Sequence, residues 1–254
     1  MSVPLITVLI STYNDRLLVP KKLAEIRRQS LFEQAEFIFL ETNSPERERE
    51  LLAPFCSKYA QCRLITSDER KTLYEAWNLG WEAARAPLVC NSNMDDVMHP
   101  RLLEYVVAAM SRQTWQAATV LIVKTTLGTS GIDWNSKAVA NLPLSLRPGP
   151  FTVWRRELKE TVGMFDGEFV AAGDKDFWSR LLANRCSLGL IPKVLYCYCK
   201  GPKQLSKTNG SKRKQQDAAR ISTKPYSHRW SGKIRWQIFF LRYLYRYFPN
   251  YFKG

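Results

Sequence analysis

Three short polar segments hold the residue types that could do chemistry in this chain. They are Ser11-Thr12-Tyr13-Asn14, Asn93-Met94-Asp95-Asp96 and Gly173-Asp174-Lys175-Asp176-Phe177-Trp178. The first two follow short apolar runs, so in an α/β fold they would lie at the carboxyl ends of parallel strands, where open sheets bind ligands. The sequence therefore predicts an enzyme with a polar, acidic cleft.

Asp95 and Asp96 form a carboxylate pair at the end of an apolar run. Burying two negative charges is costly unless a cation neutralises them, and a hard divalent cation with oxygen ligands does so. Asn93 could add an oxygen ligand, or hydrogen-bond a sugar hydroxyl, without adding charge. The same residues would also suit the start of a helix near Pro100, since Asp and Asn are favoured there. Spacing alone leaves both interpretations open.

Alternating strands and helices must position these segments. The predicted strands are Ile6–Ile10, Phe37–Leu40, Arg63–Ile65, Leu88–Cys90, Thr119–Lys124, Phe151–Arg155 and Leu188–Tyr198. The predicted helices are Leu18–Gln29, Pro45–Tyr59, Leu73–Arg85, one that starts near Pro100, and Asp174–Asn184. Strand and helix alternating at these lengths predict an α/β fold with a doubly wound, mostly parallel sheet and right-handed crossovers.

Two regions depart from this alternation. Residues 125–149 are rich in Gly, Ser, Asn and Pro and show no clear period, which predicts a mobile loop or lid. Residues 200–224 are polar and basic without apolar periodicity, which predicts a flexible connector. We therefore expect a folded body over residues 1–199 and a separate tail over residues 200–254.

Composition and charge limit the classes of function that the chain could have. The chain has 254 residues and no apolar run near the roughly 20 residues of a membrane span. Its N-terminus lacks the basic segment of a secretory signal, which predicts a cytoplasmic protein. The tail carries eight Lys and six Arg against one acid, a net charge of +13, which leaves +2 of the total +15 for the body. That separation indicates a catalytic body with a basic appendage that contacts an anionic partner.

The end of the tail predicts an amphipathic helix over residues 232–252. Arg235, Arg242 and Arg246 share one narrow face of such a helix, while aromatic and aliphatic residues occupy most of the remainder. Aromatic and basic residues together suit the headgroup level of an anionic bilayer. A helix docked on the body or on a second subunit remains the alternative.

Five motifs together resemble the inverting glycosyltransferases of family 2, which have the Rossmann-like GT-A fold. The first three end strands: Val8–Asn14, Phe39–Ser44 and Asn93–Asp96. The other two are Asn78-Leu79-Gly80 with Ala84-Arg85-Ala86, and Gly163-Met164-Phe165-Asp166 followed by Gly173–Arg180. The resemblance covers about residues 4–198, and the order and spacing of the motifs are specific although each motif alone is weak. Two positions depart from the family pattern, because Asn93 and Gly173 stand where the family has acids.

The resemblance implies roles for individual residues. Asp174 would be the general base that deprotonates the acceptor, and a single base without an enzymic nucleophile implies inversion. Asp95 and Asp96 would hold a Mn²⁺ or Mg²⁺ ion on the diphosphate of the donor. The predicted nucleotide-sugar-binding residues are Ser11, Thr12, Tyr13, Glu41, Lys71, Asn78 and Asn93. The donor would bind to about residues 1–124 and the acceptor to about residues 125–199.

Two residues near the predicted base have plainer interpretations. An aromatic residue inside a helix is usually part of the core, so we expect Trp178 to pack rather than bind. Asp176 is expected to support the helix, for example by orienting Arg180 four residues on.

We therefore predict a metal-dependent inverting glycosyltransferase of polysaccharide biosynthesis. It would be peripheral to the cytosolic face of a membrane and would act on a glycan or lipid-linked acceptor. A nucleotidyltransferase is the nearest enzymatic alternative, but no Gly-rich phosphate loop with a Lys lies near the first strand. A nucleic-acid-binding protein that uses residues 200–224 as an arm is the other. We expect no nucleic-acid partner, because the basic segment adjoins an aromatic-rich helix.

Overall fold

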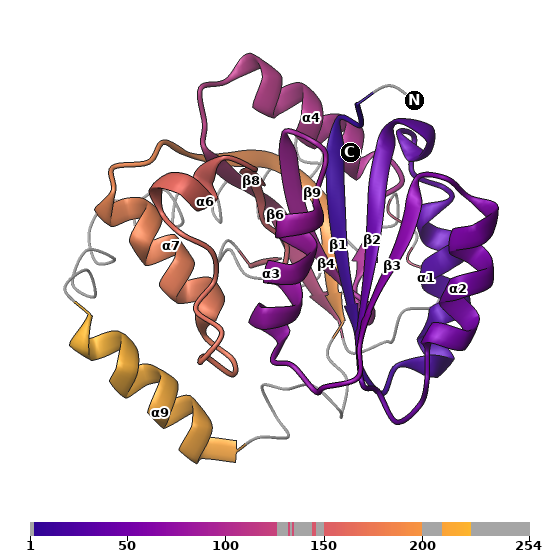
Figure 1. Cartoon of the computed structure of the whole chain (residues 1–254). Coiled ribbons are helices and arrows are strands. Elements are labelled where there is room, and N and C mark those ends of the chain that lie inside the picture. Colours follow the sequence, from indigo (N-terminus) through magenta and orange to yellow (C-terminus); the bar gives the residue numbers. More distant parts are fainter. Residues whose placement is uncertain are drawn as a thin grey trace.

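The computed structural model describes residues 3–125, 132, 134, 144–145, 150–199 and 210–224. Over these residues, nine strands form one sheet in the order β3-β2-β1-β4-β8-β6-β9-β5, with β7 paired to β6 (Figure 1). The strands are β1 Ile6–Thr12, β2 Ala35–Thr42, β3 Cys62–Ser67, β4 Leu88–Asn93, β5 Val97–Met98, β6 Ala117–Thr125, β7 Leu144–Ser145, β8 Val153–Arg155 and β9 Leu188–Cys199.

Helices cover both faces of this sheet. They are α1 Val19–Ile26, α2 Arg49–Lys58, α3 Leu73–Ala83, α4 Leu102–Arg112, α6 Leu158–Thr161, α7 Gly173–Ala183 and α9 Gly210–Thr223, with 3-10 turns at Arg16–Leu18 and Phe32–Gln34. Successive strand side chains point to opposite faces, so Ile6, Val8 and Ile10 pack with α1, α2 and α4. Leu9 packs with α3, α6 and α7 on the other face.

The prediction of a mostly parallel sheet is confirmed. β1 pairs in parallel with β2 and β4, β2 with β3, and β6 with β9. The short strand β8 lies between β4 and β6 and is antiparallel to both. The carboxyl ends of β1, β2 and β4 meet at one edge, where the register places Ser11 beside Asn93 and Thr12 beside Glu41. The pairing therefore brings the predicted strand-end segments together.

The flexible connector predicted for residues 200–224 is wrong for its second half, because residues 210–223 form α9. The helix lacks an apolar stripe in the sequence, yet Asp217 and Ile221 are buried against the body. The predicted loop at 125–149 lies mostly outside the described residues, although β7 within it pairs with β6. The predicted helix at 232–252 lies wholly outside them. No helix in the described part of the chain is long and apolar enough to cross a membrane.

Glu36 of β2 binds three other elements at the end of the sheet opposite the strand-end segments. Its fully buried carboxylate accepts a hydrogen bond from the Thr7 hydroxyl at 2.7 Å. It also accepts the Arg85 backbone N–H at 2.9 Å and the Arg85 and Arg63 guanidinium groups at 2.7 and 3.0 Å. Strands β1, β2 and β3 and the end of α3 therefore share one buried charge.

We predict that Glu36→Ala lowers the free energy of unfolding by about 1–3 kcal/mol, because it leaves the buried Thr7 hydroxyl and the Arg85 backbone N–H without their acceptor. Urea unfolding followed by circular dichroism measures the loss. Glu33→Ala, which removes an exposed carboxylate two residues before β2, should change stability by no more than about 0.5 kcal/mol. Equal stability of the Glu36→Ala variant and the wild type would contradict the role given to this network.

Candidate active site

The carboxyl ends of β1 and β2 turn sharply into loops that hold each other. Asn14 and Asn43 adopt left-handed backbone angles, with φ of 59° and 51°, which Asn tolerates better than most residues. The Asn14 N–H donates to the Ser44 hydroxyl at 3.0 Å, and the Asp15 N–H donates to the Glu48 carboxylate at 2.6 Å. These contacts fix where the chain leaves β1.

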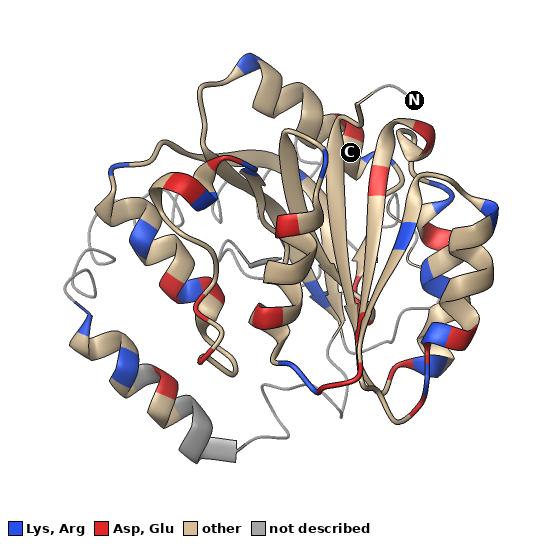
Figure 2. Cartoon of the chain, viewed as in Figure 1, with Lys and Arg blue, Asp and Glu red and all other residues tan. Residues whose placement is uncertain are grey.

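Asp15 is an acidic site residue that the sequence analysis missed. Burial chiefly, with the nearby Asp95 charge, raises the pKa of its carboxyl to about 7. The two acids come from different strand ends, so their proximity depends on the β1 and β4 pairing. An acid directly after the polar segment at the end of β1 was the available signal. Figure 2 shows acidic positions at the lower end of the sheet, close to where β1, β2 and β4 end.

Asp96 is held inside the protein. Its side chain, 1% exposed, accepts hydrogen bonds from the Tyr196 hydroxyl at 3.0 Å, the Cys199 N–H at 3.0 Å and the Asn93 amide at 3.1 Å. Its backbone carbonyl accepts the buried Lys22 ammonium at 2.6 Å. Burial raises the pKa of Asp96 well above its usual range. This geometry supports a positioning role for Asp96 rather than the predicted role of metal ligand.

Asp95 is half-buried in the turn that follows β4. Its negative charge raises the pKa of both Asp15 and Asp96. Over the described residues, no group of three or more His, Cys, Asp and Glu side chains could hold a metal ion by itself. Mg²⁺ needs only one or two carboxylates when substrate phosphates supply further oxygen ligands. Asp95 and the nearby Asp15 supply carboxylates of this kind at the ends of β4 and β1.

Tyr13 and Arg70 lie at the same edge of the sheet, in the loops after β1 and β3. The Arg70 guanidinium carbon lies 3.3 Å from the centre of the Tyr13 ring, and its Nη1 donates to the Thr42 hydroxyl at 3.4 Å. The neighbouring Thr12 hydroxyl is buried and has no hydrogen-bond partner among the described residues. Arg70 was not predicted, because it meets Tyr13 only after the loop from β3 folds back over β1.

Three other predicted donor-binding residues have protein partners. Glu41 is fully buried, accepts the Ser44 N–H at 2.5 Å and pairs with Arg49. Lys71 pairs with Glu69 at 3.5 Å. Asn78 is bonded on both sides of its amide to the backbone of Phe165, at 2.7 and 3.0 Å. Glu41 and Asn78 therefore hold loops in place, which assigns them positioning roles, whereas Ser11 stays half-buried beside Asn93.

Asp174 lies in the first turn of α7 and is half-buried. Its carboxylate accepts the Lys175 N–H at 2.9 Å and the Tyr74 hydroxyl at 3.4 Å. Burial raises the pKa of Asp174 to about 6. A carboxylate with this pKa is mostly ionised at neutral pH and is still basic enough to accept a proton in a reaction.

Tyr74 explains why Gly173 precedes this acid. A Cβ atom at residue 173 would lie 2.8 Å from three carbons of the Tyr74 ring. The ring is buried and packs against Trp77 and Phe165, with centroids 5.5 and 5.9 Å away, so it has no room to retreat. The close approach of the Tyr74 ring therefore requires glycine at residue 173.

Hydrogen bonds connect α7 to the acidic edge of the sheet. One turn after Asp174, the Trp178 indole donates to the Thr152 hydroxyl at 3.3 Å. The Thr152 N–H in turn donates to the Asn91 side chain on β4 at 2.9 Å, two residues before Asn93. These two bonds tie α7, through Thr152, to the strand that ends at Asn93.

The two plainer expectations for α7 are confirmed. Trp178 is buried in the core, as its place inside a helix suggested. Asp176 pairs with Arg180 at 2.8 Å, one helical turn away. Arg180 in turn donates to the carbonyls of residues 162–164, so this pair anchors α7 to the segment before it.

Comparison with known proteins identifies related folds. Residues 7–178 match the family model described as Glycosyl transferase family 2. The fold is similar to TarS 1-349 from S. aureus in complex with UDP-GlcNAc, with a TM-score of 0.68, 14% identity, and coverage of 87% of this chain and 67% of that one. It is also similar to the mannosyltransferase PcManGT from Pyrobaculum calidifontis in complex with GDP-Man and Mn²⁺, with a TM-score of 0.61, 17% identity, and coverage of 81% and 59%. The chain thus spans about two thirds or less of these structures. No curated protein sequence matches it.

We predict that Gly173→Ala lowers the free energy of unfolding by about 1–3 kcal/mol, because the added methyl group overpacks the Tyr74 ring. Thermal unfolding measures the change. A double-mutant cycle with Tyr74→Ala supplies the control: the penalty of the alanine should disappear once the ring is gone. A penalty that persists in the Tyr74→Ala background would show that the ring is not its cause.

Proposed function

We propose that this chain, which belongs to glycosyl transferase family 2, moves a sugar from a nucleotide-sugar donor to a hydroxyl group of a glycan or glycolipid, with inversion at the anomeric carbon. The chain is a glycosyltransferase with the GT-A fold. The donor, the acceptor and the stereochemistry belong to the proposal. The observation that carries it is the half-buried Asp174, whose pKa of about 6 suits a general base and whose helix is hydrogen-bonded through Thr152 to β4, the strand that leads to Asp95.

Asp174 would accept the proton of the attacking hydroxyl group. Burial makes the carboxylate a stronger base than an exposed Asp, and the Tyr74 hydroxyl and Lys175 N–H hold its orientation. One carboxylate acting as base leaves the acceptor oxygen as the nucleophile. A single displacement inverts the anomeric carbon.

Asp95 would hold a divalent cation, with Asn93 and Asp15 adding oxygen groups nearby. A bound Mn²⁺ or Mg²⁺ ion would neutralise negative charge on the diphosphate leaving group. The Mn²⁺ in the PcManGT complex supports this assignment by similarity of fold. Asp96 would fix the turn that carries Asp95, through its bonds to β9.

The nucleoside would lie at the ends of β1 and β2. Tyr13 offers a ring face, and the Thr12 hydroxyl offers a buried group without a protein partner among the described residues. Arg70, now stacked on Tyr13, is a cation that could pair with donor phosphate. The UDP-GlcNAc and GDP-Man in the two similar structures support a nucleotide-sugar as donor.

The lipid-linked acceptor and the peripheral attachment to the cytosolic face of a membrane stay predictions. They rest on residues 232–252, outside the described part of the chain. Membership of the family favours the glycosyltransferase over the nucleotidyltransferase and the nucleic-acid-binding alternatives.

We predict that Asp95→Ala lowers the turnover of an accepted nucleotide-sugar, assayed with Mn²⁺, by about 100-fold or more, because several kcal/mol of charge stabilisation are lost. Release of nucleoside diphosphate from UDP-GlcNAc and GDP-Man measures turnover. Glu160→Ala, which removes an exposed acid from α6, is the control and should keep wild-type turnover. Equal turnover by the Asp95→Ala and wild-type proteins would rule out the proposed metal site.

We predict that the rate rises with pH around a midpoint near 6, because only the ionised form of Asp174 accepts a proton. The hydrogen bond from Tyr74 lowers the pKa of Asp174, so Tyr74→Phe should move the midpoint to higher pH. Asp174→Asn should remove most of the activity at every pH. A Tyr74→Phe profile that coincides with the wild type, or moves to lower pH, would refute the assigned contact.

A further inference from the structure

Residues 166–172 form the segment that leads into α7 and Asp174. It follows α6 and ends at Ala172, the residue before the first turn of α7. Within the segment, the Glu168 and Phe169 N–H groups bond back to Asp166, which closes a turn. Ala172 has no side-chain oxygen with which to cap α7. The position of the helix start therefore depends on contacts from elsewhere.

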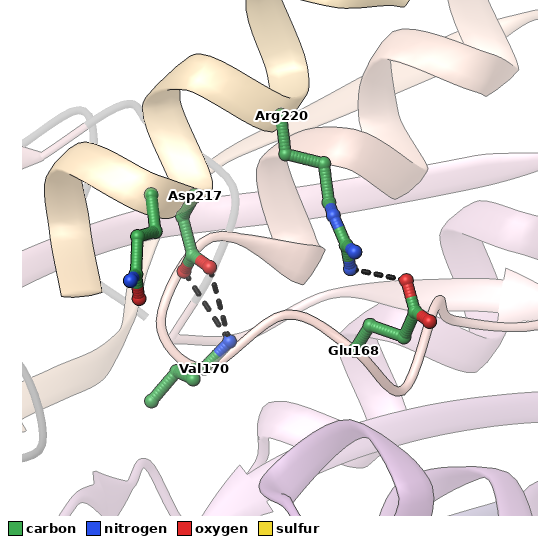
Figure 3. Close-up of a pocket in the computed structure, with 5 residues that line it drawn as sticks. Glu168, Val170, Asp217 and Arg220 are labelled. Atoms are coloured by element: carbon green, nitrogen blue, oxygen red, sulfur yellow. Dashed lines mark hydrogen bonds and ion pairs between the residues drawn. The ribbon is translucent and has the colours of Figure 1, made fainter.

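Asp217 of α9 supplies such a contact. Its carboxylate accepts the Ala171 N–H at 2.7 Å and the Val170 N–H at 3.3 Å to each oxygen (Figure 3). The side chain is 4% exposed, so these bonds form away from water, where a missing partner is costly. One acid of α9 thus binds the two backbone N–H groups immediately before Ala172.

Residues near Asp217 also contact the segment over residues 166–172. Arg220 pairs with Glu168 and lies 5.7 Å from the centre of the Phe169 ring, and Lys224, just beyond the helix, lies 3.6 Å from the Asp166 carboxylate. Ile221 is buried in the same apolar cluster as Phe169. Spacings of three and four residues place Arg220 and Ile221 with Asp217 on one face of α9. That face meets the segment through opposite charges and an apolar contact.

A cavity of about 390 Å³ opens beside this contact and is lined by Glu168, Val170, Gln216, Asp217 and Arg220 (Figure 3). Asp217 also stands near the proposed base. Burial chiefly raises the pKa of the Tyr74 hydroxyl, and the Asp174 and Asp217 charges both add to the rise. Tyr74 therefore lies within electrostatic reach of both acids.

We propose that Asp217 is a positioning residue for Asp174, acting through residues 170–172 to fix the start of α7. The inference rests on the proposed function, because it takes Asp174 as the base. α9 is then a catalytic support of this chain rather than a linker. Losing the contact would let the start of α7 shift, and a misplacement of about 1 Å at a reacting group can cost about 100-fold in rate.

The test uses the full chain with Asp217→Asn, which keeps the size of the side chain and one acceptor oxygen but loses the charge. We expect kcat to fall about 10- to 100-fold while KM for the nucleotide-sugar changes by less than about twofold. Amide hydrogen exchange of residues 168–176 should become faster. Asp217→Glu should restore part of kcat. Gln216→Ala, an exposed neighbour that lines the same cavity, is the matched control and should leave kcat and exchange unchanged.

The outcomes separate this inference from the proposed function. Unchanged exchange in the Asp217→Asn variant, or faster exchange with wild-type kcat, would overturn the positioning role and leave Asp174 as the base. A fall in thermal stability with kcat unchanged would likewise reduce Asp217 to a structural residue. Wild-type turnover by Asp174→Asn would instead show that the proposed base is wrong, and the inference would fall with it.

Discussion

Negative charge gathered at one buried edge of a parallel sheet is the constraint on which the rest of this structure depends. Each buried acid there needs donors, since an unpaired charge away from water is too costly. Glu41 takes the Ser44 N–H and Arg49, while Asp96 takes Tyr196, Cys199 and Asn93. These bonds tie the loop after β2 and the turn after β4 to their surroundings. Charge burial thus shapes the site before any substrate binds.

The same constraint separates residues that hold the site from those that face a substrate. Burial and the neighbouring Asp95 charge together raise the pKa of Asp15 to about 7. A bound cation would relieve that repulsion. Asp174 differs, because burial rather than a neighbouring acid sets its pKa near 6. The acids at the sheet edge lie close to one another, which suits binding of a cation, whereas Asp174 is made more basic by burial alone, which suits proton transfer.

Most of the fold followed from local patterns, because alternating apolar strands and amphipathic helices of these lengths permit few other sheets. The strand ends were predicted, so the polar segments after β1 and β4 were expected at the edge where the pairing places them. Asp174, in the first turn of α7, was proposed from the family resemblance instead. Arg70 and Tyr74 were missed because their contacts join elements far apart in sequence, which leave no local signal. Asp15 directly follows the polar segment at the end of β1, but its proximity to Asp95 depends on the pairing of β1 with β4. α9 was missed for a related reason: Asp217 attaches it to backbone N–H groups, and no periodic apolar stripe marks that contact.

The two departures from the family pattern have one explanation. The Asn93 amide donates to the buried Asp96 carboxylate at 3.1 Å, whereas an aspartate there would set a second negative group against it. At residue 173 the Tyr74 ring fills the space that a side chain would need, and its hydroxyl bonds the Asp174 carboxylate instead. At residue 93 the neighbouring Asp96 disfavours a second acid. At residue 173 the Tyr74 ring excludes an acidic side chain, and the Tyr74 hydroxyl contacts Asp174. A motif position is therefore best interpreted with the residues that pack against it, because the partner decides which side chain the chemistry permits.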